Sequence, residues 1–363
     1  MNEIQTNFLY ASILLLATLL GYCAHKHKTT YEIRIGYKTI LHLDLIKSCF
    51  LILSYMIGVV PLVLRTCGAD TPTYYWSYVH ERTTGVDFFF YQVLKILHSV
   101  IPNPQIGLGI ISAISLLLIY VSIEMSSEIV DAGLSYFAFY CCIYFFMYNY
   151  LRMMLASSIV ILGFGFILRE KNIKGLVCFG IASLFHLSAI LVLLSYFVVI
   201  YLRKRRKLVI SMVLIMAAVF VLRPSVFLNL ISVDRYNTHI AVGLRNTTIG
   251  FGTFLKAFPI IVVLLYYKKE LEEYREYNIL LISAILNFAI SLVGYYVPVA
   301  SRLGNMYFVM HYIFSVPWVF SMIKRQHNIQ IINLIFLGYY MIQYYFINSN
   351  FVTMQIIPYT GGV

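Results

Sequence analysis

The chain has 363 residues, of which 61% are hydrophobic and only 12% are charged, and its mean hydropathy is +0.81. Soluble globular domains usually carry about 25% charged residues, so this composition excludes that class. The formal charge of +12 does not indicate a nucleic-acid partner, because the basic residues of a membrane protein gather in its cytoplasmic loops.

Apolar runs of about 20 residues recur along the chain and are typical of transmembrane helices. The first, Phe8–Cys23, lacks a basic leader and a small-residue cleavage site, so we interpret it as a first span rather than a signal peptide. The predicted fold class is an all-α polytopic membrane protein, one domain over residues 1–363, with about 10 full transmembrane helices plus one re-entrant or bent hairpin, or 10–12 spans. The candidate spans are 6–23, 44–64, 106–123, 132–150, 152–168, 207–222, 251–267, 278–297, 303–323 and 329–347.

The run from Gly175 to Tyr201 is 27 residues long and carries His186 near its midpoint. A single crossing would place the basic pentad at 203–207 on the side opposite to Arg169, whereas a hairpin that turns near His186 keeps the basic loops on one side. The positive-inside rule therefore favours the hairpin. Each half is shorter than the ~20 residues of a full crossing, which predicts a re-entrant or bent pair that lines a cavity.

With this hairpin both chain termini lie outside. Asp44 and Lys47, spaced i,i+3, are expected to satisfy each other. With Lys47 set aside, 17 basic residues lie inside, ten of them lysines, and nine lie outside, seven of them arginines. Arginine presents a planar fork that grips phosphate in a bidentate way, whereas lysine acts as a point charge. The outer face therefore favours a diphosphate site. The predicted inner loops are 24–43, 124–131, 169–174, 202–207, 268–277 and 324–328, and the outer arginines are Arg65, Arg82, Arg152, Arg223, Arg235, Arg245 and Arg302.

Two predicted outer loops are long, 65–105 and 223–250. Connections of this length in a compact protein usually act as lids or binding loops. The first loop contains an amphipathic stretch from Asp87 that we expect to lie flat at the membrane surface. The second contains Arg235 and Arg245, which makes both candidates for substrate binding.

Four segments resemble the EpsG/Wzy-type polysaccharide polymerases of bacterial capsule, exopolysaccharide and O-antigen assembly. They are LRTCGADTPTYYWSYV with Asp70 and Tyr74, NYLRMMLASSIVIL with Arg152, IASLFHLSAILVL with His186, and SRLGNMYFVMHYIFSVP with Arg302. Their order and spacing match the family over roughly residues 60–320. The family usually has Gln after the helix-opening Arg, where this chain has Met153.

The resemblance implies a GT-C-like enzyme of the bacterial inner membrane with its active site toward the periplasm or cell exterior. A glycan linked to a lipid diphosphate, such as undecaprenyl diphosphate, is then transferred to the non-reducing end of another lipid-linked repeat unit. No cofactor, metal or nucleic acid is expected. The implied partners are the lipid-diphosphate-linked oligosaccharide, membrane lipid, and the chain-length regulator and flippase of the same pathway.

Arginines are the candidate ligands of the departing diphosphate. Arg152 and Arg302 are each expected to open a helix that runs inward, and two helix N-termini at one cavity add partial positive charge. Arg65, Arg235 and Arg245 are further candidates on the same face. The alternative is that these side chains extend to lipid headgroups.

Two residues are candidates for the catalytic base. His186 is interpreted as the base, as a diphosphate ligand or as a cap of the hairpin, and the sequence leaves these three open. Asp70 is interpreted as the base, as an acceptor for sugar hydroxyls or as an ion-pair partner. Tyr74, four residues later, is expected to share a helical face with Asp70 and to bind substrate.

Two other functions compete with polymerisation. A flippase or transporter for lipid-linked oligosaccharide predicts inverted repeats with broken helices in both halves, and the sequence shows one hairpin and no second copy. A membrane acyltransferase of surface glycans usually places an Arg/His motif in its first span, and Phe8–Cys23 contains neither residue.

Overall fold

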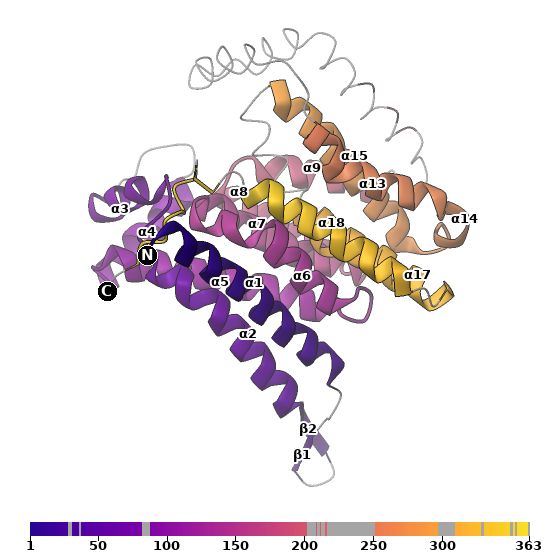
Figure 1. The fold of residues 1–363 in the computed structure, drawn as a ribbon, viewed down its shortest axis with the longest axis horizontal. Helices are drawn as coiled ribbons and strands as arrows, with labels where there is room; N and C mark the ends of the chain where they lie inside the picture. The colour runs from indigo at the N-terminus through magenta and orange to yellow at the C-terminus, as the bar shows by residue number, and fades with distance from the viewer. Residues whose placement is uncertain are drawn as a thin grey trace.

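The structure, a computed structural model, describes residues 1–27, 31–35, 38–81, 88–201, 208, 211, 215, 251–296, 309–327, 330–348, 351–352 and 354–361. These residues form a helical bundle with one antiparallel β-hairpin (Figure 1). The elements are α1 Glu3–Lys26, β1 Tyr31–Ile35, β2 Lys38–Leu43, α2 Leu45–Leu64, α3 Thr71–Val79, α4 Phe88–Val100, α5 Pro104–Ser126, α6 Ala132–Cys142, η1 Tyr144–Tyr148, α7 Leu151–Leu168, α8 Asn172–Phe185, α9 Ala189–Tyr201, α13 Phe251–Tyr266, α14 Lys268–Leu271, α15 Arg275–Tyr296, η3 His311–Ser315, α17 Val316–His327 and α18 Gln330–Asn348.

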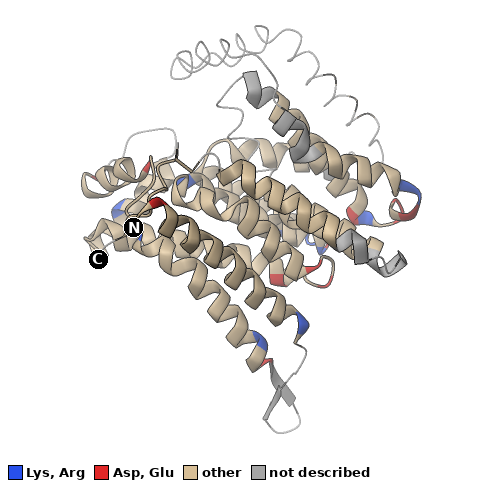
Figure 2. Ribbon diagram, in the orientation of Figure 1, with Lys and Arg blue, Asp and Glu red and all other residues tan. Residues whose placement is uncertain are grey.

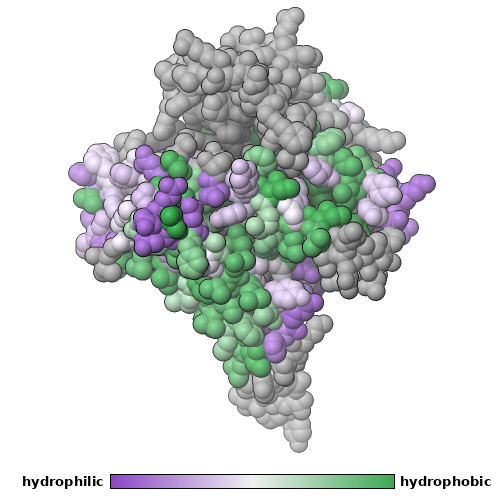
Figure 3. All heavy atoms as spheres, in the orientation of Figure 1, coloured by the Kyte–Doolittle hydropathy of each residue, from purple (hydrophilic) through white to green (hydrophobic). Residues whose placement is uncertain are grey.

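The protein is a helical membrane protein. Within the described ranges, five helices are long and apolar enough to cross a bilayer, namely Glu3–Lys26, Leu45–Leu64, Pro104–Ser126, Leu151–Leu168 and Arg275–Leu292. Charged residues gather near helix ends, and apolar side chains cover the middle of the visible face (Figures 2 and 3). The prediction of a polytopic helical fold is thus confirmed, but about 10 spans are not, because several apolar helices are shorter than a full crossing. The predicted span 207–222 lies almost entirely outside the described residues.

The bundle has two distinct ends. Both chain termini lie at one of them, which we call the terminal end, and the β1–β2 hairpin lies beyond the other, which we call the hairpin end (Figure 1). The Met1 ammonium donates to the carbonyl oxygen of Tyr359 across 3.4 Å, so the first and last parts of the chain are in contact. The sequence predicted this arrangement of the termini.

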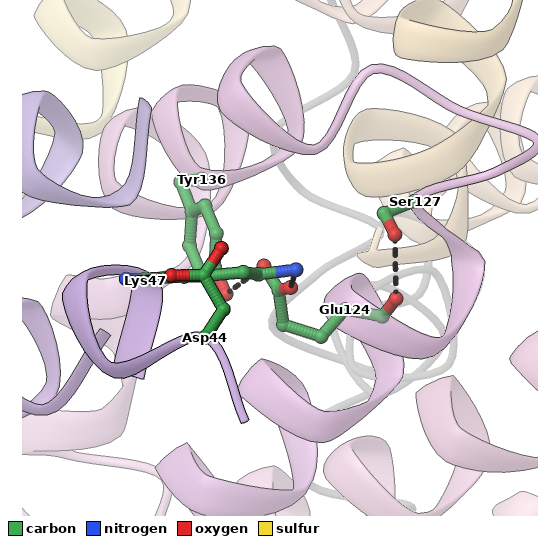
Figure 4. A network of polar contacts seen from close by, with 5 residues as sticks. All are labelled: Asp44, Lys47, Glu124, Ser127 and Tyr136. Atoms are coloured by element: carbon green, nitrogen blue, oxygen red, sulfur yellow. Dashed lines mark hydrogen bonds and ion pairs between the residues drawn. The ribbon is translucent and has the colours of Figure 1, made fainter. Parts of the chain in front are cut away.

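A polar network at the hairpin end joins α2 to α5 and α6 (Figure 4). The Lys47 ammonium lies 2.6 Å from Oε2 of Glu124, and Oε1 of the same carboxylate accepts a 3.0 Å hydrogen bond from the Tyr136 hydroxyl. The expected contact between Asp44 and Lys47 forms through the backbone of Lys47 and not as an ion pair. Asp44 instead caps α2 by accepting the backbone N–H of Lys47 at 2.9 Å, because a carboxylate at the N-cap satisfies a free helical donor.

Two further ion pairs connect loops that the charge pattern placed on one side. Arg169, after α7, pairs with Glu128 of the α5–α6 loop at 2.6 Å. Arg275, at the start of α15, pairs with Glu170 at 2.6 Å and donates to Asn172. Loops 124–131, 169–174 and 268–277 therefore share the hairpin end, as predicted. Loop 202–207 lies outside the described residues.

The run from Gly175 to Tyr201 folds back on itself. α8 and α9 have 14 and 13 residues, and the helix is interrupted from His186 to Ser188. The ring of Tyr196 in α9 lies 5.3 Å from that of Phe179 in α8 and 5.4 Å from that of Phe164 in α7. Residues on both sides of the break therefore face each other, which confirms the hairpin.

The predicted span 132–150 is not one helix. α6 ends at Cys142, and the chain continues as the 3-10 turn η1. The helix breaks here because tyrosine hydroxyls on either side of the break form hydrogen bonds with different partners. The Tyr144 hydroxyl donates to the Gly58 carbonyl at 2.7 Å, whereas the Tyr140 hydroxyl meets that of Tyr120 at 2.8 Å. Buried hydroxyls need such partners in an apolar core, and this column of tyrosines fixes the segment that leads into α7.

Candidate functional site

Loop 65–70, between α2 and α3, forms one wall of a polar site at the terminal end. Gly68 adopts φ = +114°, a conformation that side chains rarely tolerate. A Cβ at this position would lie 2.5 Å from the backbone oxygen of Tyr148. The loop thus approaches the η1–α7 connection closely enough that only glycine fits, and Asp70 follows two residues later.

A hydrogen bond joins this loop to the start of α7. The backbone N–H of Asp70 donates to Oδ1 of Asn149 at 2.7 Å, and Asn149 is buried. Asn149 lies three residues before Arg152, so the bond places two polar segments that are about 80 residues apart in the sequence side by side. Sequence reasoning missed Asn149, although an amide in a run of aromatic residues is a detectable signal.

Arg152 lies in the first turn of α7, as predicted. Tyr150 is the N-cap of this helix and makes no side-chain capping bond. The Arg152 side chain is half-buried, and its Nη1 lies 3.4 Å from the hydroxyl of Tyr91 in α4. Tyr91 was also missed, because the amphipathic pattern of α4 indicates only that one face is buried.

Tyr74 lies near both Asp70 and Arg152. Its N–H donates to the carbonyl of Asp70 at 3.1 Å, which confirms the shared helical turn. Burial raises the pKa of the Tyr74 hydroxyl to about 12, with the Arg152 charge opposing and the Asp70 charge adding to this shift. Tyr74 is therefore a neutral hydroxyl at pH 7 that lies within electrostatic range of both charged side chains.

His186 caps α8 at the hairpin break and is half-buried. Its Nδ1 lies 2.5 Å from the hydroxyl of Ser188. The preceding Phe185 packs edge-on against Phe89 of α4, with the ring centroids 5.0 Å apart. Since α4 contacts Arg152 through Tyr91 and the His186 turn through Phe89, this helix bridges the two predicted site segments.

Arg65 has a different position from the other candidates. It is 7% exposed, and its Nε donates to the backbone oxygen of Tyr148 at 3.2 Å. Its Nη1 bonds the Leu62 carbonyl and the Ser112 hydroxyl, and its guanidinium lies 5.6 Å from the centroid of the Tyr148 ring. These contacts fix the end of α2 against η1, so Arg65 supports the site from within the protein.

Three predicted substrate-binding residues, Arg302, Arg235 and Arg245, lie outside the described residues, as does loop 223–250. The described part of the site therefore holds one of the two expected helix N-termini, that of α7. In the same described ranges, no group of three or more His, Cys, Asp or Glu side chains is arranged as a metal site.

Comparison with known proteins identifies one family. Residues 48–360, most of the chain, match the model of the EpsG family. This region includes the whole polar site and extends 43 residues beyond the last motif segment, which ends at Pro317. No curated protein and no solved structure matches the chain.

Proposed function

Since the chain belongs to the EpsG family, we propose that it is a polysaccharide repeat-unit polymerase of a bacterial inner membrane. One observation carries this proposal: Asp70 and Tyr74 from one segment lie close to Arg152 from another at the terminal end of the bundle. The two family motifs that contain these residues therefore contribute to one site. Such a site suits a charged substrate that is anchored in the bilayer.

The proposed reaction is a glycosyl transfer. A hydroxyl oxygen at the non-reducing end of one lipid-linked repeat unit attacks the anomeric carbon of a second, lipid-diphosphate-linked glycan. The new glycosidic C–O bond forms as the bond between that carbon and the phosphate oxygen breaks. The lipid diphosphate leaves with the electron pair, and a base accepts the hydroxyl proton.

Arg152 is proposed to stabilise the departing diphosphate. Negative charge grows on the phosphate oxygens as the bond breaks, and a positioned guanidinium at a helix N-terminus stabilises it without reorganising. The Tyr74 hydroxyl adds a neutral hydrogen-bond donor. Arg302, Arg235 and Arg245 are proposed from the sequence as further ligands of the substrate.

Asp70 and His186 are both proposed as the proton acceptor, and the geometry favours Asp70. Asp70 lies beside Tyr74 and is held by Asn149 next to Arg152, whereas His186 reaches the same region through α4. His186 is also engaged with Ser188, which suits a cap of the hairpin or a diphosphate ligand.

The terminal end is proposed to face the periplasm or cell exterior. The basic loops that the structure describes gather at the opposite end, and basic loops are retained in the cytoplasm. Substrate then arrives from the lipid-exporting step of the same pathway, and a chain-length regulator is a further proposed partner.

Deletion of the gene tests the function. A polymerase mutant is expected to display surface glycan capped with a single repeat unit, because export and ligation still proceed. Loss of all surface glycan would point instead to a flippase, and full-length glycan that lacks acyl groups would point to an acyltransferase. Electrophoresis of the surface glycan, with the wild-type gene restored as control, distinguishes the three outcomes.

A further inference from the structure

The C-terminal tail, defined here as residues 354–361, lies across the terminal end of the bundle. Phe351 leads into it after α18, and its fully buried ring packs 4.8 Å from that of Phe145 and 5.7 Å from that of Tyr10. Within the tail, Ile356 is also fully buried. The tail is therefore an integral part of the bundle, and the family match extends through it to residue 360.

The tail supplies the hydrogen bonds of the loop that carries Asp70. The N–H groups of Thr66, Gly68 and Ala69 donate to the carbonyls of Thr360, Gln355 and Met354, at 2.7, 2.9 and 2.9 Å. Arg65 and Gly361 form an antiparallel bridge at the edge of this pairing. Loop 65–70 has no helix or strand of its own, so its path is set by contacts with the tail, with Asn149 and, through Arg65, with Tyr148.

The tail is itself held by α1 and α2. The Tyr10 hydroxyl donates to the Ile356 carbonyl at 2.6 Å, and the N–H of Tyr359 donates to the Thr6 hydroxyl at 2.9 Å. The Tyr359 hydroxyl donates to the Pro61 carbonyl at 3.1 Å. Through these bonds the tail transmits the position of two long helices to a loop that has no helix of its own.

We propose that the tail is a positioning segment for glycosyl transfer: docked against loop 65–70, it holds Asp70 at its working distance from Arg152. This inference rests on the proposed polymerase function. The tail touches neither reacting group, so its effect on the reaction passes through the loop. A docked tail is then the active state of the enzyme.

Loss of the docking contacts is the first test. A chain that ends after Gln355 loses the contacts to Thr66, Tyr10 and α2, and Tyr359→Phe loses only the bond to Pro61. Because a displacement of about 1 Å at a site costs up to ~100-fold in rate, we expect at least a ~10-fold lower kcat in the truncated protein. The Km for lipid-linked donor should stay within about two-fold, because Arg152 stays in place. Tyr345→Phe, at an exposed tyrosine of α18, is the matched control.

A crosslink is the second test and distinguishes positioning from simple stability. Thr66 and Thr360 are both exposed and share a backbone hydrogen bond. Directly opposed residues of such a pair lie about 5.5 Å apart, within the range of a disulfide. The double variant Thr66→Cys/Thr360→Cys should form this disulfide and keep wild-type polymerisation when oxidised, with Thr66→Cys alone as control.

Each outcome decides the inference. Inactivation on oxidation would show that the tail must leave the loop, and full activity of both the truncated protein and Tyr359→Phe would show that the tail is dispensable; either result overturns it. Loss of activity only in proportion to the amount of folded protein also overturns it. If the wild-type protein itself extends no lipid-linked glycan, the proposed function fails, and the inference fails with it.

Discussion

At the residue scale, burial separates Arg65, which supports the protein, from Arg152, which is proposed to bind substrate. Arg65 gives its N–H groups to Tyr148, Leu62 and Ser112, whereas Arg152 lies half-buried at the opening of α7. Composition predicted that outer arginines bind a diphosphate, and it treated all of them alike. Burial decides between them, and burial depends on neighbours about 80 residues away that no local pattern reveals.

Replacement of Arg152 by lysine tests the diphosphate contact. Lysine keeps the charge but loses the planar fork, so we expect a ~100-fold lower polymerisation rate at normal abundance in the membrane. Arg169→Lys, in an ion pair at the hairpin end, is the control and should keep its rate. Full-length polymer from Arg152→Lys would favour contact with lipid headgroups instead. The sequence makes the same prediction for Arg302→Lys.

Variants of Asp70 and His186 distinguish the roles of the two candidate bases. Asp70→Asn keeps the shape and the backbone bond to Asn149 but cannot accept the proton, so turnover should fall while binding of lipid-linked donor persists. If the imidazole of His186 only caps the hairpin, His186→Asn should keep near-normal polymerisation. If His186 binds the diphosphate, His186→Gln should bind the lipid-linked donor more weakly. Normal turnover in Asp70→Asn would move the base role to His186.

At the element scale, the Lys47–Glu124 pair fastens the hairpin end of α2 to α5. Its side chains are 31% and 19% exposed, so removing one partner leaves a partly buried charge. We expect Lys47→Met to destabilise the protein by about 1–2 kcal/mol. This is the usual contribution of a charged hydrogen bond, reduced because the pair is partly exposed to solvent. Lys95→Met, which breaks the more exposed pair with Glu81, should have little effect. Thermal unfolding in detergent measures both, and equal shifts would contradict the assignment.

The order of most elements could be predicted from the sequence, and their interruptions could not. The apolar runs and the basic pentad were enough for α1, α2, α5, α7 and the α8–α9 hairpin. The break between α6 and η1 depends on which partner each tyrosine hydroxyl finds, and the bonds between the tail and loop 65–70 join backbone groups. Neither kind of interaction produces a periodic pattern that can be recognised in the sequence.

At the scale of the whole molecule, the two ends should lie on opposite sides of the membrane. A cysteine at Thr360, exposed at the terminal end, should react with an impermeant maleimide on intact cells from which the outer membrane has been removed. A cysteine at Lys174, exposed at the hairpin end, should react only after lysis. Ready labelling at Lys174 in intact cells would show that the protein has the opposite orientation. Cysteines at Asn246 and Lys204 extend the test to segments outside the described residues.

The contact between the tail and loop 65–70 also orders events during synthesis. The loop leaves the ribosome long before Thr360, whose carbonyl accepts the N–H of Thr66. Membrane segments that emerge first have the whole remaining time of translation to insert and pack. The wall of the site that carries Asp70 is therefore completed only after the tail has been synthesised, so a nascent chain that does not yet include the tail already sits in the bilayer without an assembled centre.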